Sequence, residues 1–185
     1  MKEEFLLFWN GPFSQWYKSH MEIRGVVYNC CEQYMMAGKA SLFKDHEALE
    51  KVMSESDPRA QKQIGKEVKG FDKDVWESVA RDIVFKANVA KFTFNEEIRK
   101  YLFESFPKTI VEASPYDPIW GIGLGEKDPK ALDRSQWQGK NWLGEVLMEV
   151  REALLVDYVL GPVHVRDGSV DVLEQEAQGG LWQNP

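Results

Sequence analysis

Apolar residues recur at intervals of three and four through most of this chain, which is the period of an α-helix. The clearest run spans 73–91, where charged residues separate Val75, Val79, Ile83, Ala87 and Ala90. The same spacing predicts further helices over 28–42, 45–54, 57–70, 95–106 and 141–155. Asp45, Asp57 (followed by Pro58) and Asn95 stand where the N-caps of three of these helices are expected.

Short extended segments are predicted at 5–9, 22–28 and 109–112, with a hairpin at 163–172 around Asp167-Gly168. The stretch 113–139 fits neither period and is rich in Pro and Gly, with two tryptophans among them. A long irregular stretch inside a compact domain is typical of a functional loop. We therefore predict an α+β fold, mainly α-helical, as a compact single domain with short strands over 1–160. A C-terminal extension over 161–185 follows, as a hairpin and then a frayed tail.

Composition narrows the function classes. The 185 residues carry 23 basic and 30 acidic side chains, a formal net charge of −7. This balance argues against a protein that tracks the nucleic-acid backbone, although one nucleotide in a pocket is compatible with it. No apolar run is long enough to span a membrane. Cys30 and Cys31 are adjacent, so they neither close a loop nor have metal-ligand spacing. We expect reduced thiols, no metal and a cytoplasmic protein.

Two places in the chain suggest chemistry. Glu32 and Lys39 lie seven residues apart, which puts them on one helix face at ~10 Å and lets them line one pocket; the alternative is two solvated charges. Gly121 opens a Gly-rich turn suited to close approach of a ligand, and a plain surface loop fits the spacing equally well. Trp120, close to Asp117 in the same loop, is placed to stack on a base or sugar ring.

Several blocks of this sequence, in order, resemble the NADAR family. They are Gly25-Val26-Val27-Tyr28-Asn29-Cys30-Cys31-Glu32-Gln33-Tyr34-Met35-Met36-Ala37-Gly38-Lys39-Ala40, then Phe43-Lys44-Asp45, Trp76, Ala90-Lys91-Phe92, Val111-Glu112-Ala113-Ser114-Pro115-Tyr116-Asp117 with Ile119-Trp120-Gly121, and Trp137-Gln138-Gly139-Lys140-Asn141-Trp142-Leu143-Gly144 with Leu147-Met148-Glu149-Val150-Arg151. They cover about 5–155. Two positions depart from the pattern: Gln33 where many members have His, and Gln15 where many have Asn.

The resemblance implies an N-glycosidase that acts on ribosyl N-glycosides and needs no cofactor. Members remove ADP-ribose from modified guanine or cleave phosphoribosylamino-pyrimidine intermediates of riboflavin synthesis. The implied partner is thus a small nucleotide-like molecule or a single ADP-ribosylated guanine in nucleic acid, with no membrane. The implied catalytic residues are Glu32, Lys39 and Asp117. The implied substrate-binding residues are Trp76, Glu112, Trp120 and Asn141, to which we add Gly121 and Arg24.

Breaking a ribosyl C–N bond builds positive charge at C1′, so a carboxylate beside that carbon stabilises the transition state. We expect Glu32 to do this or to activate water. Lys39 offers a second route, through a Schiff base at C1′ of an opened ribose. Asp117 would bind ribose hydroxyls or protonate the leaving base. Candidate phosphate contacts are Arg24, Lys39, Lys140 and Arg151. The alternative function is a non-catalytic ADP-ribose or NAD-binding module, which has no need of Glu32 and Lys39.

Overall fold

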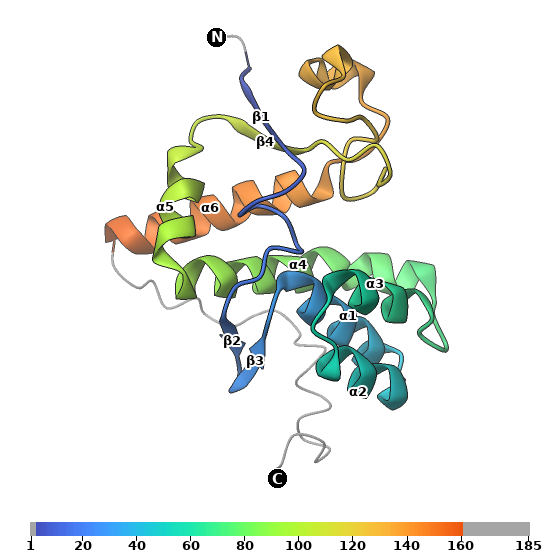
Figure 1. The fold of residues 1–185 in the computed structure, drawn as a ribbon. Helices are drawn as coiled ribbons and strands as arrows, with labels where there is room; N and C mark the ends of the chain where they lie inside the picture. The colour runs from blue at the N-terminus through green and yellow to red at the C-terminus, as the bar shows by residue number, and fades with distance from the viewer. Residues whose placement is uncertain (1–2, 161–185) are drawn as a thin grey trace.

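The computed structural model describes residues 3–160 (Figure 1). The elements in chain order are β1 (Phe5–Phe8), β2 (Met21–Ile23), β3 (Val26–Tyr28), α1 (Cys31–Leu42), α2 (His46–Ser54), α3 (Pro58–Lys66), α4 (Lys73–Phe94), α5 (Glu96–Glu104), β4 (Thr109–Glu112) and α6 (Trp142–Leu160). Two short 3₁₀ turns, Pro129–Leu132 and Arg134–Gln136, lie in the long loop before α6. The predicted class, mainly helical with short strands in one domain, is confirmed. The predicted hairpin at 163–172 lies outside the described residues.

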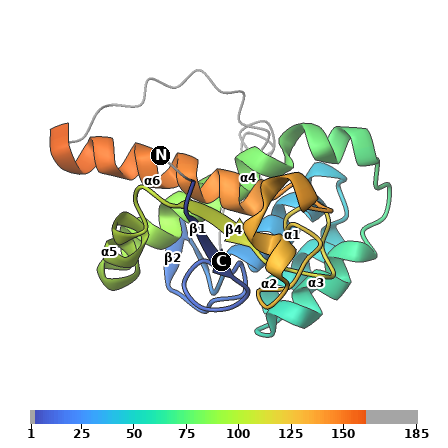
Figure 2. The ribbon, with the colours of Figure 1, turned by 90° about the horizontal axis from the view of Figure 1, so that it is seen from above.

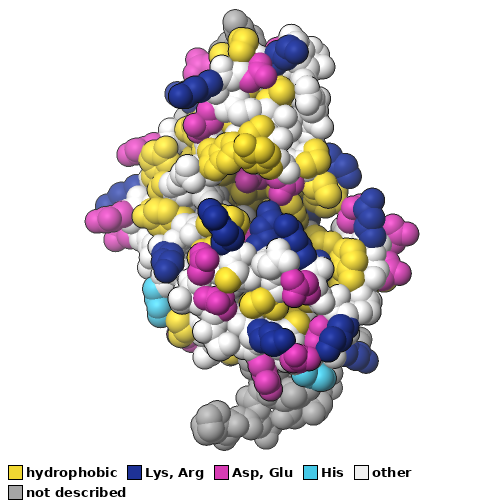
Figure 3. All heavy atoms as spheres, turned by 45° about the vertical axis from the view of Figure 1, so that its right-hand side comes forward, with side chains coloured by type: hydrophobic (Ala, Val, Ile, Leu, Met, Phe, Trp, Pro, Cys, Tyr) yellow, Lys and Arg dark blue, Asp and Glu magenta, His cyan; other side chains and the backbone are white. Residues whose placement is uncertain are grey.

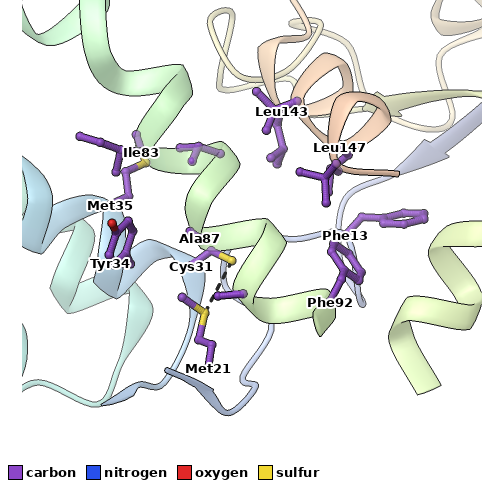
Figure 4. Close-up of a cluster of buried hydrophobic side chains, with 14 of the residues drawn as sticks. Phe13, Met21, Cys31, Tyr34, Met35, Ile83, Ala87, Phe92, Leu143 and Leu147 are labelled. Atoms are coloured by element: carbon purple, nitrogen blue, oxygen red, sulfur yellow. Dashed lines mark hydrogen bonds between the residues drawn. The ribbon is translucent and has the colours of Figure 1, made fainter. Parts of the chain in front are cut away.

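Helix α4 is the centre of the packing. It packs against α1 on one side and α6 on the other (Figures 1 and 4). In Figure 4 its Ile83 and Ala87 lie between side chains of α1, such as Met35, and side chains of α6, such as Leu147. Burying this apolar surface is the main stabilising contribution to the fold, and it fixes α1, which carries Glu32 and Lys39.

The strand pair β1–β4 joins the start of the domain to the segment that leads into the irregular loop. The strands are parallel, with Phe5 opposite Thr109 and Phe8 opposite Glu112. β4 also packs on α6, and Figure 2 shows the pair beside that helix. The pairing leaves Glu112 at the end of β4, immediately before the irregular loop. The fold thereby fixes the backbone of a carboxylate at the point where the loop begins.

Some predicted elements were wrong in detail. The strand expected over 22–28 is a hairpin, in which Arg24 and Gly25 have positive φ angles of 53° and 78°. Two positive φ angles are the requirement of a type I′ turn, and Arg24 hides that signal because Asn or Gly is usual there. The helix expected to reach 70 ends at Lys66, and α4 and α6 run past their predicted ends.

The predicted helix N-caps were also correct in part. The side chains of Asp45 and Asp57 accept hydrogen bonds from the backbones of Ala48 and Arg59, as predicted. Asn95 is the N-cap residue of α5, as predicted, but its side chain makes no capping hydrogen bond, because its amide donates to the backbone oxygens of His20 and Lys91. A side-chain amide can donate as well as accept, and here it ties the end of α4 to the segment before β2.

The structure also bears on the membrane, metal and thiol expectations. Within residues 3–160, no helix is long and apolar enough to cross a membrane. The same residues hold no group of three or more His, Cys, Asp or Glu side chains arranged for a metal ion. Cys30 and Cys31 are free and buried, and burial raises the pKa of the Cys30 thiol to about 11. Neither thiol is therefore ionised at neutral pH.

Candidate active site

Glu32 is a buried carboxyl group on α1 and lies at the centre of the site. Ten of the twelve residues of α1 are buried, including Glu32, which is 4% exposed. The alternative interpretation of a solvated charge on a helix face is therefore wrong. Burial raises the pKa of Glu32 to about 7, and the charge of Asp117 adds to that effect. A carboxyl group in this range is protonated or ionised in comparable amounts at neutral pH, as acid–base catalysis requires.

Glu112, at the end of β4, is a second carboxyl group with a raised pKa. Burial, and then the charge of Asp117, raise its pKa to about 8. Its Oε2 is buried and has no hydrogen-bond partner among the described residues. A buried polar atom without a partner is costly in the free protein, and a hydrogen bond from a ligand would remove that cost. The charge of Glu32 adds a smaller raising effect on the pKa of Glu112.

Asp117 joins these two carboxyl groups from the irregular loop. Its Oδ1 accepts hydrogen bonds from the backbone of Ile119 at 3.1 Å and of Trp120 at 2.9 Å. Its Oδ2 lies 3.6 Å from Nζ of Lys62 on α3. Helix α1, helix α3, strand β4 and the loop thus meet at one group of charges. Figure 3 shows this face with a hollow that contains acidic side chains, below a hydrophobic patch and above Lys or Arg side chains.

Lys39 lies further along α1, in a largely aromatic environment. Its Nζ donates to the backbone oxygen of Gly65 at 2.7 Å and lies 4.1 Å from the ring centroid of Phe71. The ring of Trp76, one of the predicted site residues, is 5.6 Å away. Burial lowers the pKa of Lys39, and Glu32 partly offsets that effect. A lowered pKa increases the neutral, nucleophilic fraction of the amine.

Trp16 belongs to this site, although the sequence pattern did not single it out. Its indole Nε1 donates to Oε2 of Glu32 at 3.2 Å. The segment around Trp16 is anchored from α4, where the buried Lys91 donates to the backbone oxygen of Ser14 at 2.9 Å and Asn88 donates to Gln15. The signal available in the sequence was Lys91 itself, a charge on the buried face of an amphipathic helix, which requires a fixed partner.

Asn141 and Gly121 contact the backbone of the residues that carry the carboxyl groups. The Asn141 side chain accepts a hydrogen bond from the backbone of Glu112 at 2.9 Å and donates to the backbone oxygen of Ile110 at 3.0 Å. Both polar atoms are thus engaged with β4, so Asn141 positions Glu112. A Cβ atom on Gly121 would lie 2.9 Å from the backbone oxygens of Asp117 and Glu112. Only glycine permits this approach without a shift of the backbone.

Trp120 and Gln33 are held by contacts of their own. Trp120 is half-buried and packs edge-to-face on Trp142, with ring centroids 5.7 Å apart. It lies three residues after Asp117 in the loop, and its stacking on a base or sugar ring stays a prediction. Gln33, at the position where many members of the family have His, donates to the backbone oxygen of Val52 and accepts from the backbone of Asn29. Its amide is therefore structural.

The structure does not bring the predicted arginines to the carboxyl groups. Arg24 lines a separate cavity of about 230 Å³ with Tyr34 and Ser41, residues on the face of α1 opposite to Glu32 and Lys39. Arg151 is 3% exposed and donates to Oγ of Ser105 and the backbone oxygen of Lys108. Its buried Nε has no hydrogen-bond partner among the described residues, so its expected phosphate contact stays a prediction that this enclosed position does not favour.

The structure is a single, mainly helical domain in which carboxyl groups of α1, β4 and the irregular loop lie near a lysine of α3. The chain belongs to the NADAR domain family, whose model matches residues 7–155. It is 42% identical to N-glycosidase R617 of Acanthamoeba polyphaga mimivirus, over 76% of this chain and 85% of that protein. It is 36% identical to Protein irg-1 of Caenorhabditis elegans, over 81% and 79%. The NMR structure of the Escherichia coli protein YbiA matches with a TM-score of 0.71 and 28% identity, covering 90% of this chain and 94% of that chain.

Proposed function

We propose that this chain is an N-glycosidase that hydrolyses a ribosyl C–N bond, with Glu112 as the acid and Glu32 as the base. The observation that carries this proposal is the pair of buried carboxyl groups, whose pKa values are raised to about 7 and about 8. With these values Glu112 is mostly protonated at neutral pH, whereas Glu32 is about half ionised. One group can then donate a proton while the other accepts one.

The reaction balances with these two residues. As the C1′–N bond breaks, its electron pair moves to the nitrogen of the leaving group. That nitrogen takes a proton from Glu112. The positive charge at C1′ is stabilised by the carboxylate of Glu32. Water then adds to C1′ and gives its proton to Glu32. Asp117 lies beside both groups and supplies a fixed acceptor for ribose hydroxyls, and Trp120 supplies an aromatic face for the leaving base.

A second route runs through Lys39. If the C1′–O4′ bond opens, C1′ is held as an imine by the nitrogen of the base, and the neutral amine of Lys39 can add to it. The C1′–N bond to the base then breaks, the base leaves with a proton from Glu112, and water later hydrolyses the Schiff base on Lys39. Its half-buried position and lowered pKa support this route. The two routes differ in the group that attacks C1′, which is water in the first and Lys39 in the second. Only the second route forms a covalent adduct with the protein. That adduct is a measurable difference.

We further propose a ribosyl N-glycoside of nucleotide size as the substrate, either ADP-ribosylated guanine or a phosphoribosylamino-pyrimidine. The net charge of −7 supports recognition of one extruded or terminal nucleotide, because extended contact with a phosphate backbone needs a basic face. The buried free thiols Cys30 and Cys31 support a reducing compartment such as the cytoplasm.

The proposal is tested by incubating the protein with ADP-ribosylated guanine in DNA and, separately, with the riboflavin intermediate. Release of a free ribosyl product from either one supports the N-glycosidase. Binding of ADP-ribose or NAD with no release from either substrate class would instead support the binding module and contradict the proposal.

A further inference from the structure

Lys62 on α3 lies beside the carboxyl groups and forms a long ion pair with Asp117. Its Nζ is 3.6 Å from Oδ2 of Asp117, and the two side chains are 40% and 23% exposed. Charge-assisted hydrogen bonds between an ammonium and a carboxylate are ~2.7–2.9 Å long. Asp117 is fixed by the backbone N–H groups of Ile119 and Trp120. Lys62, on a flexible four-carbon stem, is therefore the member of the pair that is free to move.

Other cations expected to meet a phosphate have different contacts. Lys39 donates to the backbone oxygen of Gly65 at 2.7 Å. Nζ of Lys140 lies 4.7 Å from the ring centroid of Trp142. Arg151 is buried against Ser105 and Lys108. Lys62 differs from these three cations, because its contact is an ion pair with Asp117, beside the buried carboxyl groups.

We propose that Lys62 binds the phosphate group attached to the ribose of the substrate, an inference that rests on the proposed function. To do so, Lys62 breaks its ion pair with Asp117. Both substrate classes carry a phosphate on the ribose whose C–N bond is cut. The phosphate monoester of one substrate class bears more negative charge than a carboxylate, and the diphosphate of the other carries two charges on neighbouring groups. Both have more acceptor oxygens than a carboxylate, so either is the stronger partner for a mobile ammonium. The exchange also frees the Asp117 carboxylate for ribose hydroxyls.

The same exchange links phosphate recognition to the proton on Glu112. In the free protein the charge of Lys62 lowers the pKa of both Glu32 and Glu112. Once Lys62 pairs with phosphate, its charge is neutralised, while the charge of Asp117 continues to raise both values. Lys39 and the indole of Trp16 still favour the ionised form of Glu32. Glu112 therefore holds its proton most firmly when a phosphorylated substrate is in place.

The test uses ribose 5-phosphate and ribose as probes, with binding followed by NMR titration of the parent, Lys62→Met and Lys66→Met. Lys66 is an exposed lysine one turn further along α3, and it serves as the matched control. We expect Lys62→Met to bind ribose 5-phosphate more weakly by about tenfold or more, with ribose binding unchanged and Lys66→Met equal to the parent. Equal affinity of Lys62→Met and the parent for ribose 5-phosphate would overturn the proposal.

A second measurement follows the carboxyl ¹³C signals of Glu32 and Glu112 against pH. We expect both to titrate at higher pH in Lys62→Met than in the parent; identical titration curves would overturn the link to Glu112. Neither measurement needs turnover. A parent that binds ribose 5-phosphate through Lys62 but cleaves neither substrate supports this inference and contradicts the proposed function. A parent that cleaves, with the same KM as Lys62→Met, contradicts this inference alone.

Discussion

The indole of Trp16 donates a hydrogen bond to Oε2 of Glu32 at 3.2 Å, across the interface between the β1–β2 connection and α1. The donor side chain is 38% exposed, whereas the acceptor is 4% exposed. The bond favours the ionised carboxylate and opposes the effect of burial on its pKa. The hydrogen bond therefore helps to keep the pKa of Glu32 at about 7, although burial alone would raise it further.

Replacing Trp16 by Phe should shift the pH dependence of the reaction. Without the indole N–H, the pKa of Glu32 rises further above about 7, so less of it is ionised at neutral pH. We expect the acid limb of the kcat profile to move to higher pH and kcat at pH 6.5 to fall by about tenfold, with recovery above pH 8. Trp137→Phe is the control, because it loses an indole hydrogen bond to Ala131, far along the loop. An unshifted Trp16→Phe profile would remove this role of Trp16.

Glu32→Gln keeps the shape of the side chain and removes its charge. If Glu32 stabilises the charge at C1′ and accepts the proton of water, kcat should fall by on the order of 10²-fold or more. Ligand affinity and the circular dichroism spectrum should change little. Single-turnover rates with each substrate check the expectation. Full turnover in this variant would place the active centre elsewhere.

The sequence predicted the elements better than it predicted the roles. Periodic apolar residues located every described helix, since a buried face must repeat at 3.6 residues. The turn at Arg24-Gly25 was missed because Arg gives no turn signal. Glu32 was singled out by its spacing from Lys39 and Asp117 by its place beside Trp120, and the family blocks supplied their roles. Lys62 lies on α3 outside every block. Its role depends on which helix faces the loop, and that arrangement is set by tertiary packing.

Asn141→Ala separates a positioning role from a substrate contact. The substitution leaves the backbone N–H of Glu112 and the backbone oxygen of Ile110 without their partner. Each unsatisfied buried group costs ~1–3 kcal/mol, so we expect the free energy of unfolding to fall by about 2–4 kcal/mol. Chemical denaturation measures this loss. A raised KM with unchanged stability would instead show that Asn141 contacts the substrate.

The stability of the free protein should fall as the pH rises from about 5 to about 8. The folded pKa values of Glu32 and Glu112, about 7 and about 8, lie above the ordinary 4.5. The folded state therefore binds more protons than the unfolded state between these values, and its stability is greatest below the unfolded pKa. Glu32→Gln/Glu112→Gln should flatten this dependence of Tm on pH. A double variant that retains the parent's slope would show that other groups cause it.

Lys39→Ala distinguishes the Schiff-base route from direct attack by water. If the amine attacks C1′, the variant should lose nearly all turnover, and borohydride should trap a substrate adduct on the parent at Lys39. If water attacks directly, the loss is smaller and borohydride traps nothing. For the second route we expect trapping, because burial lowers the pKa of Lys39 and so increases its neutral, nucleophilic fraction. The exposed Lys66→Ala should leave trapping unchanged. Mass spectrometry of the reduced protein locates the adduct, and turnover by the parent without one would assign the attack to water activated by Glu32.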